Sequence, residues 1–140
     1  MPENKNTLFE QEWITLQNAY EQYEKYALII KLTSVVLCFA GLITNMATAL
    51  LSQMVLVLWM QEGIWKTYQS RIGERLLNVE HAIKNAGAER ETPFQLHSDW
   101  QAGKAGVWGL VREYLGNSLR PTVAYPYGIL ITLVWVLDFL

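Results

Sequence analysis

Two stretches of the chain are almost purely apolar, and the residues around them are polar. The first runs from Leu32 to Gln61, thirty residues without a charge. The second begins at Pro121 and reaches Leu137, or Leu140 if its last turn is included. An uncharged apolar run of about 18 residues or more is typical of a membrane-spanning helix. The pattern therefore predicts an integral membrane protein in which the second stretch is only just long enough to cross.

The first stretch is too long for one straight crossing. As a single helix, thirty residues would measure about 45 Å, against a hydrocarbon core of about 30 Å. Two short crossings fit better, over residues 26–43 and 46–63, with a tight turn near Gly41 to Asn45, where glycine and asparagine tolerate a reversal. A single, strongly tilted crossing is the alternative.

The positions of the basic residues favour the hairpin. Three Lys or Arg residues precede the first apolar stretch and eight lie between the two stretches. Basic residues near membrane spans favour the cytoplasmic side, and only a hairpin places both groups on one face. We expect a cytoplasmic N-terminus and an external C-terminus in a plasma membrane, of the bacterial inner-membrane type because no targeting signal is visible.

Apolar residues recur at steps of three and four on both sides of the predicted hairpin. Before it lie Phe9, Trp13, Leu16, Tyr20, Tyr23 and Ala27, and after it lie Trp65, Tyr68, Ile72, Leu76, Val79 and Ile83. Such spacing places each set on one face of a helix. We therefore expect cytoplasmic helices over 8–25 and 64–86 that form an antiparallel stalk. The residues expected to hold it together are Trp13, Tyr20, Tyr23, Trp65, Tyr68 and Ile72.

Two other arrangements of these stripes stay open. The stripes could pair between subunits instead of within one chain. The N-terminal stripe could also lie on the membrane surface, although its polar face is acidic and suits an anionic surface poorly.

Charges beside the stripes are complementary. The first arm carries Glu10, Glu12, Glu21 and Glu24, and the second carries Lys66, Arg71 and Arg75. We expect these groups to pair across exposed flanks, where each pair contributes only about 0–1 kcal/mol but helps to set register.

The rest of the chain completes an all-α membrane protein with a single domain. Residues 87–106 read as a loop, 107–119 as an interfacial helix and 121–138 as a third transmembrane helix that starts with Pro121. Tyr125, Tyr127 and Trp135 lie near the ends of that span and fit the aromatic belts of a membrane interface.

No group of residues indicates a reaction. His97, Ser98 and Asp99 contain the residue types of a hydrolase triad, but neighbours in sequence cannot form that geometry among themselves. Glu80 with His81, or His97 with Asp99, lack the spacing of a metal site, and Cys38 is the only cysteine. We expect no enzyme activity, cofactor or metal, and the net charge of −2 argues against nucleic acid as a partner.

Lys31 and Glu62 are the two ionisable residues closest to the membrane interior of the hairpin. Both lie about equally far from a turn centred on residues 46–47, so we expect them to meet. A register-setting ion pair is one role, and conduction or gating is the other, because ionisable groups inside membranes tend to be functional.

These expectations favour a protein that works by interaction. The expected role is a scaffold, assembly or regulatory subunit that acts through its stalk, with the lipid bilayer, copies of itself or another membrane protein as partners. The alternative is a homo-oligomeric pore lined by Lys31 and Glu62, or by Thr44 and Asn45 at the turn.

Overall fold

The part of the chain that the structure describes is entirely helical. The computed structural model describes residues 5–84, 92–96, 98, 101 and 106–140. Within these residues there are four helices and no strand: α1 (Lys5–Ile43), α2 (Thr48–Lys84), α4 (Val107–Ser118) and α5 (Pro121–Phe139). The expected all-α class is confirmed for these residues. The sequence segments 8–25 and 26–43 are two halves of one unbroken helix, as are most of 46–63 and 64–86.

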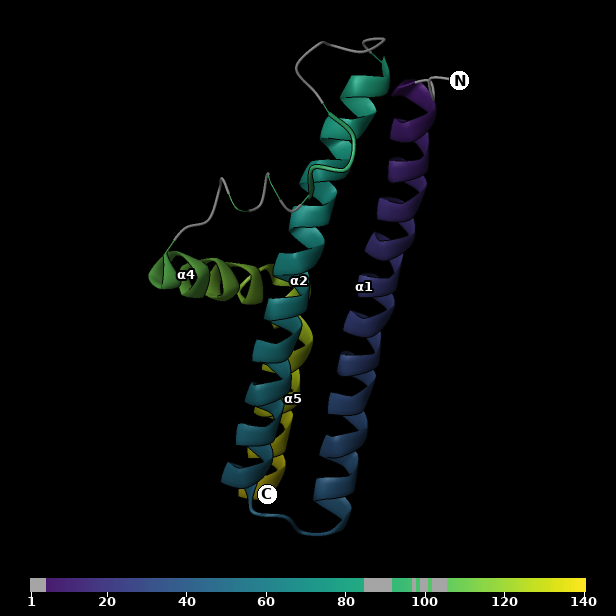
Figure 1. Ribbon diagram of the computed structural model, residues 1–140. Helices are drawn as coiled ribbons and strands as arrows, with labels where there is room; N and C mark the ends of the chain where they lie inside the picture. The colour runs from purple at the N-terminus through teal and green to yellow at the C-terminus, as the bar shows by residue number, and fades with distance from the viewer. Residues whose placement is uncertain (1–4, 85–91, 97, 99–100, 102–105) are drawn as a thin grey trace.

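The long helices α1 and α2 lie side by side and run in opposite directions (Figure 1). The reversal occupies residues 44–47 and places Asn45 in the left-handed region, with φ 50°. The amide of Met46 donates a 2.9 Å hydrogen bond to the carbonyl of Gly41 and closes the end of α1. A Cβ atom at Gly41 would lie 2.8 Å from both Cδ atoms of Leu51, so the glycine permits the close approach of the two helices beside the turn.

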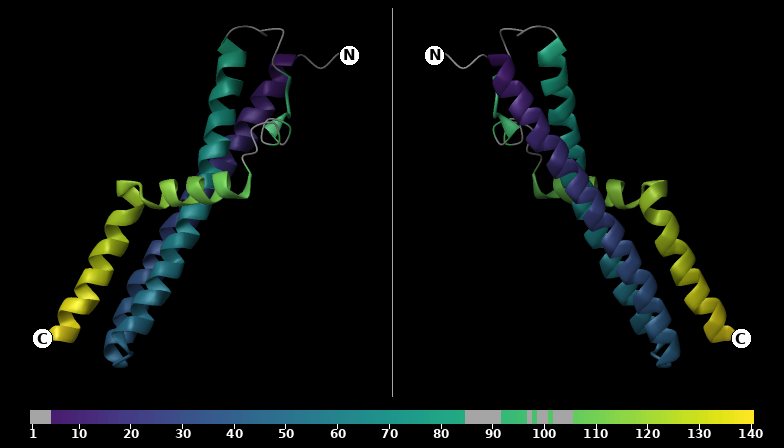
Figure 2. Two further views of the ribbon diagram at one scale, coloured as in Figure 1. Left: turned by 90° about the vertical axis from the view of Figure 1, so that its left-hand side faces the viewer. Right: turned by 90° about the vertical axis from the view of Figure 1, so that its right-hand side faces the viewer.

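The short helix α4 runs crosswise to this pair, and α5 turns back toward the α1–α2 turn (Figure 2). Arg120 precedes Pro121, whose missing amide hydrogen is harmless at the first position of a helix. Helix α5 packs against α2 and α1. Its buried residues Val123, Tyr127 and Val134 share one apolar core with Cys38, Leu51 and Val55.

A second apolar core lies toward the N-terminal end of α1. It is formed by Phe9, Leu16, Ile72, Val79 and Ala82. The two cores lie toward opposite ends of the α1–α2 pair, the first of them shared with α5, and the crosswise helix α4 contacts α2 between them.

Two of the described helices, α1 and α5, are long and apolar enough to cross a membrane. Helix α2 is not one of the two, because its apolar half includes Gln53, Gln61 and Glu62, which lower its mean hydropathy.

Candidate functional site

A buried polar cluster lies where α1, α2 and α5 meet. Glu62 of α2 is fully buried, and the Lys31 Nζ atom of α1 lies 3.0 Å from its Oε1 atom. The Tyr127 hydroxyl of α5 donates a 2.6 Å hydrogen bond to the Oε2 atom. Oε1 makes no well-directed hydrogen bond among the described residues, so its contact with Lys31 is mainly electrostatic. The structure thus brings together the two residues of the sequence-predicted pair and adds a third.

Apolar and aromatic residues close this cluster on its other sides. The Trp59 ring stacks on the Tyr127 ring with centroids 6.0 Å apart and an interplanar angle of 11°. Ser34, also fully buried, donates its hydroxyl hydrogen to the Ile30 carbonyl at 2.9 Å. Toward the turn, the contact between the helices is filled by Cys38, Leu51 and Val55. The cluster therefore links three helices, and within it the positive charge of Lys31 balances the negative charge of Glu62. An apolar core lies beside it.

The prediction for Tyr127 is wrong. The sequence placed this residue in an aromatic belt at the membrane interface, but the side chain is fully buried against α2. Tyr125 is 70% exposed. The spacing of Val123, Tyr127 and Val134, at four and then seven residues, is a one-sided helical pattern that could have indicated the buried face.

The junction between α4 and α5 contacts α2 just beyond the polar cluster. The Trp59 indole donates a 2.8 Å hydrogen bond to the Ser118 carbonyl, and the Asn117 amide donates one of 2.8 Å to the Thr67 hydroxyl. Gly63 makes this approach possible, since a Cβ atom there would lie 1.8 Å from the Ser118 Oγ atom. This contact was not predicted from the sequence. The small residues Gly63 and Thr67, one turn apart, were its signal.

The predicted stalk segments, residues 8–25 of α1 and most of 64–86 in α2, form one half of the helix pair, which we call the arm. The two aromatic stripes of the arm meet within one chain. Tyr23 is the centre of the contact: its ring lies 5.2 Å from the Trp65 ring and 6.5 Å from the Tyr68 ring. Ile72 is buried, and Trp13 and Tyr20 are partly buried against the same core. Tyr68 remains 38% exposed. All six residues that were expected to hold the stalk therefore lie at or beside the α1–α2 contact.

An ion pair between Glu12 and Arg75 is buried inside this arm. The Arg75 Nε atom donates to Glu12 Oε1 at 2.9 Å, and only 3% and 5% of the two side chains are exposed. The Thr92 carbonyl accepts a 2.9 Å bond from Arg75, and the Phe94 amide donates one of 2.8 Å to Glu12. The expectation that these charges lie on exposed flanks is wrong for this pair. Their remaining hydrogen bonds to residues 92–94 are what allow burial.

A second ion pair fastens α4 to the arm. Two Arg71 nitrogens donate to the Glu113 carboxylate, at 3.4 and 2.7 Å. The hydrogen bond to Glu113 raises the pKa of Arg71 above its usual value, so the guanidinium stays charged at every physiological pH.

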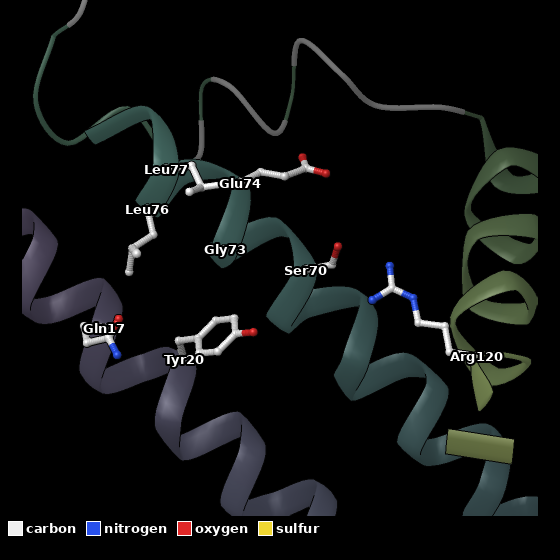
Figure 3. Close-up of a pocket in the computed structure, with 8 residues that line it drawn as sticks. All are labelled: Gln17, Tyr20, Ser70, Gly73, Glu74, Leu76, Leu77 and Arg120. Atoms are coloured by element: carbon white, nitrogen blue, oxygen red, sulfur yellow. The ribbon is translucent and has the colours of Figure 1, made fainter. Parts of the chain in front are cut away.

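A groove of about 410 Å³ runs along the arm beside α4 (Figure 3). Its lining residues come from both long helices and from the start of α5: Gln17, Tyr20, Ser70, Gly73, Glu74, Leu76, Leu77 and Arg120. Gly73 faces the Tyr20 ring, where an added Cβ atom would lie 3.3 Å from Cε2. Arg120, Ser70 and Glu74 point into the same space in Figure 3.

Among the residues that the structure describes, the other candidates are not assembled into a site. His97 and Asp99 lie outside the described residues, and Ser98 is exposed. Glu80 and His81 are exposed neighbours, and no group of three or more His, Cys, Asp or Glu side chains that could hold a metal occurs among the residues searched. Thr44 and Asn45 lie exposed at the turn.

A search of protein-family models, curated proteins and solved structures finds no match to this chain.

Proposed function

We propose that this protein is a membrane adaptor. It crosses a plasma membrane three times, by the α1–α2 hairpin and α5, and holds the other half of α1 and α2 on the cytoplasmic side as a rigid docking arm. One observation carries the proposal: the α1–α2 pair is divided into two unlike halves. The uncharged half, residues 32–61, exposes apolar side chains, whereas the charged half, the arm, has a buried core of its own.

Exposure supports the membrane placement of the uncharged half. Only 22% of the apolar window of α1 and 17% of that of α5 is buried, whereas a core helix of a soluble protein is mostly buried. On α1 the exposed apolar residues include Leu32, Val36 and Phe39, each more than half exposed. Helix α5 has 19 residues, about 28 Å, which matches a hydrocarbon core of about 30 Å.

Helix α4 has the character of an interfacial helix at the base of the arm. Its Trp108 side chain is 86% exposed, and Val107 at its first position and Leu119 just beyond its last are also exposed. Tryptophan exposed beside apolar residues is typical of the headgroup region. The crosswise course of α4 between the arm and α5 fits a helix that lies in the membrane plane (Figure 2). Basic residues on the arm side favour a cytoplasmic orientation.

The arm has the properties of a preformed docking element. Its aromatic stripes and the Glu12–Arg75 pair are satisfied within the chain, so the arm does not need a second copy to bury them. Its open concave surface is the groove beside α4, which carries the opposite charges of Arg120 and Glu74 and the apolar side chains of Leu76 and Leu77. We expect this groove to hold a segment of a larger membrane-associated protein, because it combines apolar contact with both charge signs.

Cysteine accessibility tests the topology. In a Cys38→Ala background, single cysteines replace Thr7, Asn45 or Leu140. A membrane-impermeant reagent added outside should label the cysteines at positions 45 and 140 and spare the one at position 7. Labelling of position 7 together with position 140, or protection of position 45, would contradict the hairpin.

Photo-crosslinking in native membranes tests the docking role. A photoreactive residue at Ser70 or Leu77 in the groove should give one defined adduct, and the same residue at exposed Asn78 should not. The adduct should re-form when the identified partner is purified and mixed with this protein. An adduct of twice the chain's own mass would instead favour self-assembly, and equal adducts from groove and control positions would contradict a docking groove.

An oligomeric pore is the alternative. It requires polar residues on the outward faces of the spans, and the exposed residues there are mainly apolar, while Glu62 is enclosed. Ion flux through liposomes that contain the purified protein would favour the pore over the adaptor.

A further inference from the structure

A pocket of about 300 Å³ lies between α1 and α2, at the boundary between the uncharged half and the arm. Its lining comes from these two helices alone: Glu24, Lys25, Ala27, Leu28, Lys31 and Lys66. Exposed apolar residues on α1 become continuous at this level, beginning with Tyr26 and Leu28 and continuing to Ile29 and Leu32. The pocket therefore lies at the boundary between the charged arm and the apolar surface.

Positive charge dominates this lysine pocket. The Lys66 ammonium donates a 2.8 Å hydrogen bond to the Gln69 amide oxygen, a neutral partner that leaves its charge uncompensated. Within the described part of the chain, Lys25 makes no ion pair. Lys31 is shared with buried Glu62, and Glu24 is the one carboxylate among the lining residues. Two ammonium groups are thus free to meet an anion.

We propose that the lysine pocket binds the phosphate of an anionic phospholipid in the cytoplasmic leaflet. Lys25 and Lys66 contact the phosphate oxygens, Leu28 lies against the glycerol, and the acyl chains follow the exposed apolar face of α1 that continues from Leu28. Basic pockets between membrane helices on the cytoplasmic side are a recurrent form of anionic headgroup site. This inference rests on the membrane placement proposed above.

The apolar side of the pocket favours a lipid over free phosphate. Inorganic phosphate would use the ammonium groups and leave Leu28, which is 57% exposed, in contact with water. A phospholipid covers both. Because Lys31 lines the pocket and also pairs with Glu62, a bound lipid would lie directly beside the polar cluster that links the three helices.

Native mass spectrometry of the detergent-purified protein tests this site. The wild-type chain is equilibrated with equal amounts of phosphatidylglycerol and phosphatidylethanolamine, and the bound lipids are counted. We expect preferential retention of phosphatidylglycerol and a loss of that preference by about tenfold or more in the double variant Lys25→Gln, Lys66→Gln, since both ammonium groups that contact the phosphate are then removed. The matched control is Lys84→Gln with Arg112→Gln, which removes the same charge at the end of α2 and on α4 and should keep the preference.

Three results would overturn the lysine pocket: no preference in the wild-type chain, an equal loss in the control variant, or displacement of the lipid by millimolar inorganic phosphate. Circular dichroism melts of both double variants show whether each still folds. A chain that stays soluble without detergent and carries no lipid would instead contradict the membrane placement itself.

Discussion

The Tyr127 hydroxyl donates a 2.6 Å hydrogen bond to the Glu62 carboxylate, and neither side chain has any surface exposed to solvent. The bond joins the last helix of the chain to the middle of α2. It makes α5 part of the same packed unit as the hairpin, and it gives a buried carboxylate a second partner besides Lys31.

Replacing Tyr127 with Phe should weaken the attachment of α5. The change keeps the ring that stacks on Trp59 but leaves the Glu62 Oε2 atom without its donor. An unsatisfied buried acceptor costs about 1–3 kcal/mol, and more when it is charged. Thermal unfolding in detergent micelles, followed by tryptophan fluorescence, should show a lower midpoint than for the wild type. Tyr125→Phe, at a 70% exposed position on the same helix, is the control and should melt as the wild type does.

Arg75→Met should destabilise the arm strongly. Among the described residues, it leaves the buried Glu12 carboxylate with the Phe94 amide as its donor. Removal of one partner of a buried pair costs about 3–5 kcal/mol. Arg71→Met, which breaks the more exposed pair with Glu113, should cost about 0–1 kcal/mol. Chemical denaturation monitored by circular dichroism compares the two. Equal losses would show that the Glu12–Arg75 pair is not buried as described. In the double variant Arg75→Met, Glu12→Leu, part of the lost stability should return.

Gly63→Ala should push the α4–α5 junction away from α2. The added Cβ atom would meet the Ser118 Oγ atom at 1.8 Å and the Tyr114 carbonyl at 3.2 Å. Overpacking of this kind costs about 1–3 kcal/mol, and the hydrogen bond from Trp59 to the Ser118 carbonyl should lengthen or break. A shift in Trp fluorescence together with a lower melting midpoint would report both effects. Gly116→Ala on α4 has no atom within 4 Å of the new group and should leave both readings close to wild type. A normal spectrum for Gly63→Ala would rule out the close contact.

The effect of a substitution at Asn45 on stability should depend on the backbone conformation that the new residue tolerates more than on its polarity. The residue has φ 50°, a region that glycine adopts freely and that costs other L-residues about 1–2 kcal/mol. Asn45→Gly should be nearly neutral, and Asn45→Val should lower the melting midpoint, because a β-branched side chain is the least tolerant of this conformation. If valine were accepted as readily as glycine, the turn would have a different shape.

The parts of the fold that sequence could predict are those set by spacing along α1 and α2. Lys31 and Glu62 could be expected to meet because they are equally far from one turn, and an antiparallel pair preserves that distance. The aromatic stripes follow from the helical repeat in the same way. Glu12 and Arg75 were misjudged because their burial depends on residues 92–94, which return to the arm from elsewhere in the chain and supply hydrogen bonds that no local pattern shows.

The contacts of α5 could not be predicted for a related reason. Where Tyr127 lies depends on how α4 crosses α2 and delivers Arg120 to the start of α5. The position of α4 depends on two contacts with α2: Ser118 packs against Gly63, and Asn117 donates a hydrogen bond to Thr67. These four residues are small or polar, so they give little signal in a hydropathy pattern. An aromatic residue near the end of an apolar stretch then reads as a membrane-interface residue whether it faces lipid or the bundle.

Helix α1 continues without a break from Lys5 to Ile43, and this continuity fixes the rotational phase of the two halves of the molecule. Each residue of an α-helix advances the side-chain direction by about 100°. One extra residue inserted between Tyr23 and Ala27 would turn Phe9, Trp13 and Leu16 by that angle relative to Ser34 and Cys38, and both sets could no longer face α2 together. The packing of the arm and the packing beside Glu62 are therefore coupled through α1: a change in the rotation of one half about the helix axis alters which residues of the other half face α2.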